Sequence, residues 1–141
     1  MAQQERIELA LEDTLARATR PGCPPRFAEA LRYAVFPGGA RIRPEMLLGV
    51  AQACGGRHPS LAMAGAVAIE LLHCASLVHD DLPCFDDADL RRGKPALHKA
   101  YGEPAAVLVG DALIISAFEG LGREIGAACE PAAAVLAIVA T

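Results

Sequence analysis

Residues 60–81 read SLAMAGAVAIELLHCASLVHDD, and this stretch decides the fold. Its apolar residues fall on most faces of the helix that the pattern predicts, so we expect a long helix that is central and buried. Glu70 and His73 interrupt the apolar run, whose length is marginal for crossing a membrane. We therefore predict a core helix and no membrane span.

The sequence on both sides of this stretch also has helical spacing, with apolar residues recurring every three or four positions. No alternating strand pattern and no hairpin dipeptide stands out, and the loop between Pro83 and Pro95 is polar and charged. These features predict an all-α fold. We expect the further helices over residues 5–19, 26–36, 44–54 and about 104–124, and another from near Pro131.

The composition is apolar for a chain of 141 residues, at 53% hydrophobic residues and a mean hydropathy of +0.30. Either a helical core is well filled, or something outside the chain covers part of the apolar surface. The last residues, PAAAVLAIVAT, stop inside an apolar helical run without a capping residue. We therefore expect residues 1–141 to be the N-terminal part of a single domain whose C-terminal half is absent.

Charge and cysteine content exclude several classes of protein. A net charge of −4 and only 4% aromatic residues argue against nucleic acid and anionic membranes as partners. The five cysteines are odd in number and include no Cys-x-x-Cys pair, which indicates free thiols in a reducing cytoplasm. The N-terminus lacks the apolar core of a signal peptide, so we predict a cytoplasmic protein.

The long helix ends in an acidic cluster, HDDLPCFDDADLRR at residues 79–92, with five aspartates within ten positions. His73 and Asp80 are seven residues apart, which places them within about 20° of each other around the helix axis. Two carboxylates about 5 Å apart repel by roughly 3 kcal/mol at an effective dielectric of about 20. Mg²⁺ removes that cost, because it binds one or two carboxylates and leaves places for phosphate oxygens. Arg91 and Arg92 would add forked donors for phosphate.

The alternative for this cluster is a solvated loop whose aspartates and arginines pair weakly at the surface. For Asp87 and Asp89 this alternative has equal weight. It is weaker for Asp80 and Asp81, because they close an apolar helix. A helix-loop-helix calcium site does not fit, since the glycine at the sixth position and the closing glutamate are missing.

Asp111 lies on the apolar helix expected over about residues 104–124. Because a buried acid needs a partner, we expect a structural hydrogen bond or an ion pair at Asp111.

A second stretch, PGGARIRPEM at residues 37–46, has the features of an anion site. Gly38 and Gly39 free the backbone just before a helix start, and Arg41 and Arg43 alternate around Ile42. Backbone N–H groups at a helix N-terminus together with arginine side chains bind anions. The alternative is a simple interhelical turn with surface arginines. An anion site together with a metal-and-anion site indicates two phosphate-bearing substrates.

Several motifs resemble one family. HDDLPCFDDADLRRGKPALH resembles the first aspartate-rich motif of the trans-polyprenyl diphosphate synthases, and GGARIRP resembles their Gly-Gly-Lys-Arg-x-Arg-Pro motif. ELLHCASLVHDD and GEPAAVLVGDALIISAFEGL match the family in order and spacing. The resemblance runs from about residue 30 to the end, and its closest subgroup is the bacterial geranylgeranyl and farnesyl diphosphate synthases.

The resemblance implies an antiparallel helical bundle around a deep cavity, a homodimer, and condensation of isopentenyl diphosphate with an allylic diphosphate. Asp80 and Asp86 would bind Mg²⁺, with Asp81 in support. Arg91 would hold the allylic diphosphate, and Arg43, His73 and Arg92 the isopentenyl diphosphate. Gly39 and Arg41 belong to the same substrate-binding motif.

Two departures from the family pattern matter. Ala40 stands where the family usually has a lysine that contacts isopentenyl diphosphate. The family's second aspartate-rich motif would lie well beyond residue 141, so we expect this chain alone to be inactive. In the family, bulky residues four and five positions before the first aspartate stop chain growth early. Ser76 and Ala75 are small, which favours a geranylgeranyl product over a farnesyl one.

Two other functions compete with a prenyltransferase. A non-catalytic helical subunit of a heteromeric synthase is favoured by the missing half and by Ala40, and disfavoured by the intact aspartate and arginine set. A metal phosphohydrolase using His79 and Asp80 needs further metal ligands on other helices. Only His58 and His98 remain, and neither has the helical spacing of metal ligands.

Overall fold

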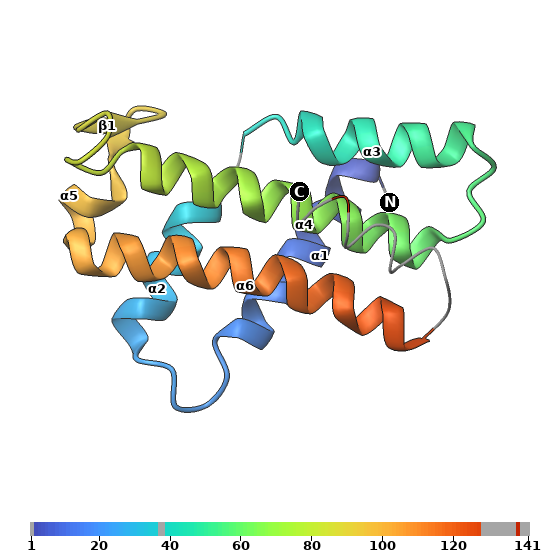
Figure 1. Ribbon diagram of the computed structural model, residues 1–141, viewed down its shortest axis with the longest axis horizontal. Helices are drawn as coiled ribbons and strands as arrows, with labels where there is room; N and C mark the ends of the chain where they lie inside the picture. The colour runs from blue at the N-terminus through green and yellow to red at the C-terminus, as the bar shows by residue number, and fades with distance from the viewer. Residues whose placement is uncertain (1, 37–38, 128–137, 139–141) are drawn as a thin grey trace.

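The structure is a computed structural model that describes residues 2–36, 39–127 and 138 (Figure 1). Helices dominate this part of the chain, which confirms the all-α prediction; the helix expected from near Pro131 lies outside the described residues. The helices are α1 (Gln3–Ala18), α2 (Pro25–Val35), α3 (Ile42–Ala53), α4 (Pro59–Asp80), α5 (Leu97–Tyr101) and α6 (Glu103–Ala127), and the strands are β1 (Leu90–Arg91) and β2 (Lys94–Pro95).

Helices α4 and α6 lie side by side and antiparallel at the centre of the molecule (Figure 1). The α6 face that meets α4 is apolar at every third or fourth position, with each side chain at most 1% exposed: Ala106, Val109, Leu113, Ala117 and Leu121. Leu71, Cys74 and Val78 of α4 belong to the same core, to which α1 and α2 contribute. Each fully buried leucine or valine in this seam contributes about 1.5–3 kcal/mol, so the seam holds the two long helices together.

Two helices are long and apolar enough to cross a membrane by length and composition alone, Pro59–Asp80 and the span Glu103–Glu124 within α6. Half of the α4 window and 39% of the α6 window are buried within the chain itself. α4 also carries Glu70, whose carboxylate is buried and paired with Arg41. These features are those of core helices, in agreement with the expectation from the sequence.

Close approach of α4 and α6 depends on Gly110. A Cβ atom at this position would lie 2.0 Å from Nε2 of His79, so only glycine leaves room for the imidazole ring. Nε2 of His79 lies 3.3 Å from the carbonyl oxygen of Val107 and 3.8 Å from Oδ1 of Asp111. Asp111 thus has a partner, His79, as expected, but the expected burial was wrong, because its side chain is 56% exposed.

The loop after α4 contains a hairpin that we did not expect from the sequence. β1 and β2 pair antiparallel, with Leu90 opposite Pro95, and Arg92 and Gly93 form the two-residue turn. Both turn residues have positive φ, 52° and 77°, as a type I′ turn requires. Arg-Gly is not one of the dipeptides that favour this turn, so the sequence carries no hairpin signal. Helix α5 was also not expected; it is only five residues long.

The Gly110 contact predicts the effect of two alanine substitutions in one helix. Gly110→Ala should lower the free energy of unfolding by about 1–3 kcal/mol, because the methyl group displaces the His79 ring. Gly122→Ala meets no atom within 4 Å and should be neutral or raise stability by up to about 1 kcal/mol through helix propensity. Urea unfolding followed by circular dichroism measures both. Equal effects of the two substitutions would contradict this packing.

Candidate functional site

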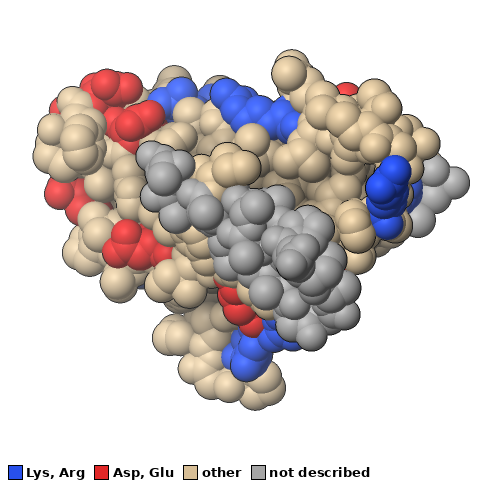
Figure 2. Space-filling model, turned by 45° about the vertical axis from the view of Figure 1, so that its right-hand side comes forward, with Lys and Arg blue, Asp and Glu red and all other residues tan. Residues whose placement is uncertain are grey.

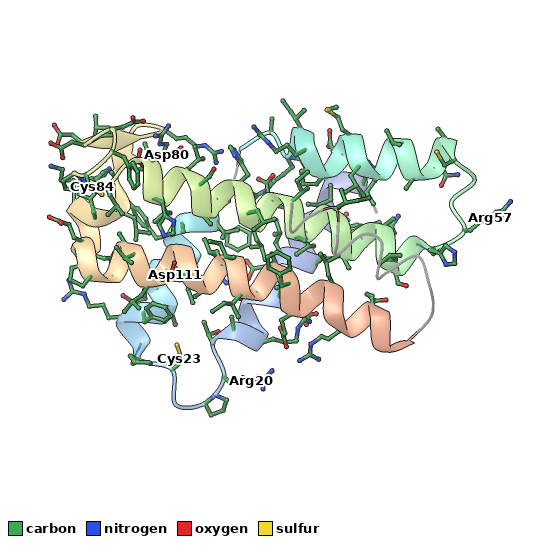
Figure 3. All side chains as sticks on the ribbon, in the orientation of Figure 1. Arg20, Cys23, Arg57, Asp80, Cys84 and Asp111 are labelled. Atoms are coloured by element: carbon green, nitrogen blue, oxygen red, sulfur yellow. The ribbon has the colours of Figure 1, made fainter. Side chains whose placement is uncertain are left out.

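The acidic cluster begins where α4 ends and the chain folds back on itself. The N–H of Asp86 donates to the carbonyl oxygen of Asp80 at 2.8 Å, and the N–H of Ala88 donates to that of Asp81 at 3.2 Å. Asp80 and Asp86 are six residues apart, yet these bonds bring them to the same end of the helix. Both are exposed. Figure 3 shows Asp80 at the hairpin end of α4, while Arg57 lies at the opposite end of the molecule.

Asp81 holds Arg91. The Asp81 side chain is only 3% exposed, and both of its oxygens accept hydrogen bonds from Nε of Arg91 at 3.1 Å, while Nη2 donates to Oδ1. This hydrogen bond is the main cause that raises the pKa of Arg91, and the charges of Asp86 and Asp80 add to it. Arg91 therefore stands beside all three predicted metal-site aspartates, with its guanidinium fixed by the buried one.

Arg92 points to a different part of the chain. Its guanidinium packs on Gly39, where a Cβ atom would lie 2.9 Å from Nη2 of Arg92. A side chain at position 39 would therefore displace Arg92. The hairpin thus separates the two adjacent arginines: Arg91 lies against the end of α4, and Arg92 lies against Gly39, far away in the sequence.

His73 is close enough to three arginines for their charges to act on it. Burial lowers its pKa below the ordinary value of 6.5, and the positive charges of Arg43, Arg92 and Arg91 lower it further, whereas Glu70 opposes them. Arg43 and Arg92 are exposed. Three segments that are distant in sequence therefore bring cationic or neutral donors to one place, which we call the cationic corner: Arg43, His73, Arg91 and Arg92. Their mutual repulsion makes this corner a site for an anion.

Arg41 is buried, whereas Arg43 is exposed. The expectation that the Arg41 side chain binds substrate was therefore wrong. Its side chain is 0% exposed and is bound by Glu8 and Glu70. Burial alone would lower its pKa, but the hydrogen bonds to the two carboxylates outweigh burial and raise it. Nearly all donors of Arg41 are used within the protein, and its buried side chain does not reach the site of Arg43. Its φ of 50° and ψ of 33° turn the side chain inward, whereas Arg43 lies within the first turn of α3.

The remaining aspartates of the cluster, Asp87 and Asp89, form ion pairs with Lys99. Nζ of Lys99 lies 3.0 Å from Asp89 and 3.6 Å from Asp87, and both carboxylates are well exposed. The hydrogen bond from Lys99 to Asp89 is the main cause that raises the lysine pKa. This arrangement is the solvated surface pairing that the sequence left open for these two residues.

The two small residues before the first aspartate lie on different sides of α4. Ala75 is 1% exposed and belongs to the core. Ser76 is exposed on the side of His73 and Asp80, and its hydroxyl donates to the carbonyl oxygen of His73 at 2.9 Å. Of the two residues predicted to set chain length, only Ser76 borders open space among the described residues.

A cavity of about 170 Å³ lies between α2, α4 and the hairpin. Its walls include Tyr33, Phe36 and Leu77, and Asp81, Arg91, Arg92 and Lys94 line its polar side. Figure 2 shows acidic atoms at one end of the visible face and basic atoms along its upper edge. The site therefore combines an apolar wall with charges of both signs.

The carboxylates present fit Mg²⁺ better than a metal held by protein alone. Among the described residues, no three His, Cys, Asp or Glu side chains form a metal cluster. Asp80 and Asp86 are the two exposed carboxylates at the end of α4, with Arg91 beside them. Mg²⁺ is usually held by one or two carboxylates together with phosphate oxygens and water, so a phosphate-bearing ligand would complete the coordination.

Two residues of this region were missed by sequence reasoning, Glu8 and Glu70. Glu70 carried a signal, because a carboxylate on a predicted buried helix needs a partner. Glu8 carried none, since its partner Arg41 is 33 residues away.

Comparisons with known proteins agree on one family. The family model described as polyprenyl synthetase matches residues 24–140. The chain is 56% identical over 140 residues to the geranylgeranyl diphosphate synthase of Cereibacter sphaeroides, covering 99% of this chain and 48% of that protein. It is 59% identical over 127 residues to the geranylgeranyl diphosphate synthase of Rhodobacter capsulatus, covering 90% of this chain and 44% of that protein.

Solved structures agree with the sequence comparisons. The crystal structure of a geranyltransferase from Legionella pneumophila superposes with a TM-score of 0.81 at 44% identity, covering 96% of this chain and 46% of that one. The chain thus spans about half the length of the curated relatives it matches.

The cationic corner predicts how His73 responds to pH and to an anion. Since the folded state lowers the pKa of His73, it disfavours the protonated form. Lowering the pH below about 6.5 should therefore destabilise the folded chain, because protonation of His73 favours the unfolded state. This destabilisation should be absent above that pH and in His73→Gln. Added pyrophosphate should raise the pKa of His73 by neutralising the arginines, which NMR of the imidazole protons would show. A His73 titration that is insensitive to pyrophosphate would contradict the corner. The resonances of His58, at the far end of α4, serve as the control.

Proposed function

Because the chain belongs to the polyprenyl synthetase family, we propose that it forms the N-terminal part of a single prenyltransferase domain. The reaction would condense isopentenyl diphosphate with an allylic diphosphate, and geranylgeranyl diphosphate is the product we favour. One observation carries the proposal. Arg43, His73 and Arg92 gather at one side of α4, while Asp80, Asp86 and Arg91 gather at its end, so two anion sites lie next to each other.

The two sites have different proposed ligands. Asp80 and Asp86 would hold Mg²⁺ with the allylic diphosphate, which Arg91 also contacts, and Asp81 keeps Arg91 in place. Arg43, His73 and Arg92 would bind isopentenyl diphosphate, and Gly39 provides the space in which Arg92 lies. Ala40 is exposed and adds no charge, so the isopentenyl site depends on these three side chains.

The proposed reaction requires two things of these residues: they stabilise negative charge on the diphosphate, and they exclude water. When bound, Mg²⁺ would neutralise negative charge on the leaving diphosphate. The Arg91 guanidinium, already fixed by Asp81, stabilises the same developing charge without having to reorganise. An apolar wall excludes water from the allylic cation. The isopentenyl double bond, held by the second site, attacks that cation, and a proton then passes to the released diphosphate.

We further propose a cytoplasmic homodimer. α6 exposes Leu108 at 58% and Ile115 at 68%, seven residues apart and thus on one stripe of the helix. An exposed apolar stripe of this kind is usually covered by another protein surface, and a second copy is the partner that the family resemblance implies.

The protein encoded by the complete reading frame tests the proposal. It should extend farnesyl diphosphate with isopentenyl diphosphate to a twenty-carbon product in the presence of Mg²⁺, and EDTA should abolish the reaction. Asp80→Asn with Asp86→Asn should lower the rate by at least about 10²-fold through loss of charge stabilisation. A complete protein that makes no EDTA-sensitive product would favour the non-catalytic subunit instead.

The position of Ser76 predicts a change in product length. Ser76→Phe in the complete protein should place a ring where the growing chain passes and shift the product from twenty carbons toward fifteen. Ala75→Phe should instead unfold the chain, because overfilling a core position costs about 1–3 kcal/mol or more. Chromatography of the extracted products, with circular dichroism of both variants, measures this difference. An unchanged twenty-carbon product from folded Ser76→Phe would show that Ser76 does not border the chain.

A further inference from the structure

We propose that Glu8 and Glu70 are positioning residues for the isopentenyl diphosphate site. They hold Arg41, and Arg41 in turn fixes the segment from which Gly39 and Arg43 reach that site. The inference rests on the proposed function but concerns two residues that contact no substrate. We call Glu8, Arg41 and Glu70 the buried triad, because Arg41 and Glu70 are buried.

The buried triad uses nearly every donor of the Arg41 guanidinium. Nε donates to Glu8 at 2.8 Å, and Nη2 donates to the other Glu8 oxygen at 3.2 Å. Nη1 donates to Glu70 at 2.7 Å, and Nη2 also donates to the carbonyl oxygen of Val35 at 3.0 Å. Glu70 is 3% exposed, whereas Glu8 is 33% exposed. A lysine could not reproduce this fork, so the site is specific for arginine.

These bonds join four elements at one point. Glu8 belongs to α1, Glu70 to α4, and Val35 is the last residue of α2. Arg41 itself precedes α3, and its carbonyl oxygen accepts the first helical hydrogen bond from the N–H of Glu45 at 3.1 Å. The start of α3 is therefore placed by the side chain and the backbone of the same residue.

The Arg41 backbone needs this support. Its left-handed conformation, with φ at 50°, costs a non-glycine residue about 1–2 kcal/mol. The triad holds Arg41 in that conformation, which directs its side chain inward and leaves Arg43 exposed two residues later. Without the triad, Arg41 would relax to another backbone conformation. This change would shift the backbone at Gly39 and the direction of the Arg43 side chain, because each residue is only two positions away.

The triad also acts on the site through α4. Glu70 lies one helical turn before His73, and its charge raises the pKa of His73 against the three arginines that lower it. Two carboxylates for one guanidinium leave a net negative charge beside the cationic corner. This charge offsets part of the repulsion among Arg43, Arg91 and Arg92 while no anion is bound.

The test measures, by isothermal titration calorimetry, the affinity of the protein encoded by the complete reading frame for inorganic pyrophosphate. Glu8→Gln should weaken binding by about tenfold, the range typical of residues that orient a ligand-binding side chain. Glu12→Gln is the matched control on the same helix, because Glu12 pairs with Arg32 at the exposed surface and should leave affinity unchanged. Leu121→Ala is the control for stability alone, since it removes a core side chain at the far end of α6.

The outcomes separate the inference from the proposed function. A complete wild-type protein that does not bind pyrophosphate overturns both. Binding by the wild type with equal affinity in folded Glu8→Gln overturns the inference only. An equal loss of affinity in Leu121→Ala, measured under conditions where circular dichroism shows that it is folded, also overturns the inference. That result would mean that the triad affects binding only through the overall stability of the fold. If Glu8→Gln does not fold, Glu8→Asp, which keeps the charge and shortens the side chain, should show the same loss of affinity.

Discussion

Helix α4 must be buried along one side and highly charged at its end, and the rest of the structure depends on this constraint. Its apolar side is covered by α6, with Gly110 admitting the His79 ring one residue before the first aspartate. Because that packing fixes the rotation of α4, it also fixes the direction of Asp80, Ser76 and His73. The end of the helix then organises the loop, through the backbone bond from Asp86 to Asp80 and the buried contact of Asp81 with Arg91.

Carboxylates decide which arginines are available to a ligand. Arg41 is satisfied by the buried carboxylate of Glu70 and the partly exposed carboxylate of Glu8, and Arg91 by the buried carboxylate of Asp81. Arg43 and Arg92 are exposed beside His73 and have no carboxylate partner among the ion pairs of the described residues. The chain thus builds a stable scaffold from some of its arginines and leaves others for an anion, although all four lie in two short motifs.

The sequence predicted the helices and the end of α4 well, because their signals are local: apolar spacing, breaking prolines and glycines, and a run of aspartates. It predicted less where the outcome depends on distant partners. Arg41 and Arg43 look alike in the sequence, and the contacts of Arg41 with Glu8 and Glu70, together with its left-handed backbone, separate them. Ala75 and Ser76 are both small, and only the packing of α4 on the core shows which one is exposed. The hairpin escaped prediction because its turn uses Arg92, which gains from contact with Gly39 and not from turn propensity.

The central claim is that Gly39, Arg43, His73 and Arg92, from three segments distant in sequence, form one anion site. Amide NMR of the labelled chain during titration with isopentenyl diphosphate tests it most directly. The account predicts that the resonances of Gly39, Arg43, His73 and Arg92 shift together with a single midpoint, while those around Arg57, at the far end of α4, do not move. Shifts confined to one segment, or separate midpoints for the three segments, would contradict it.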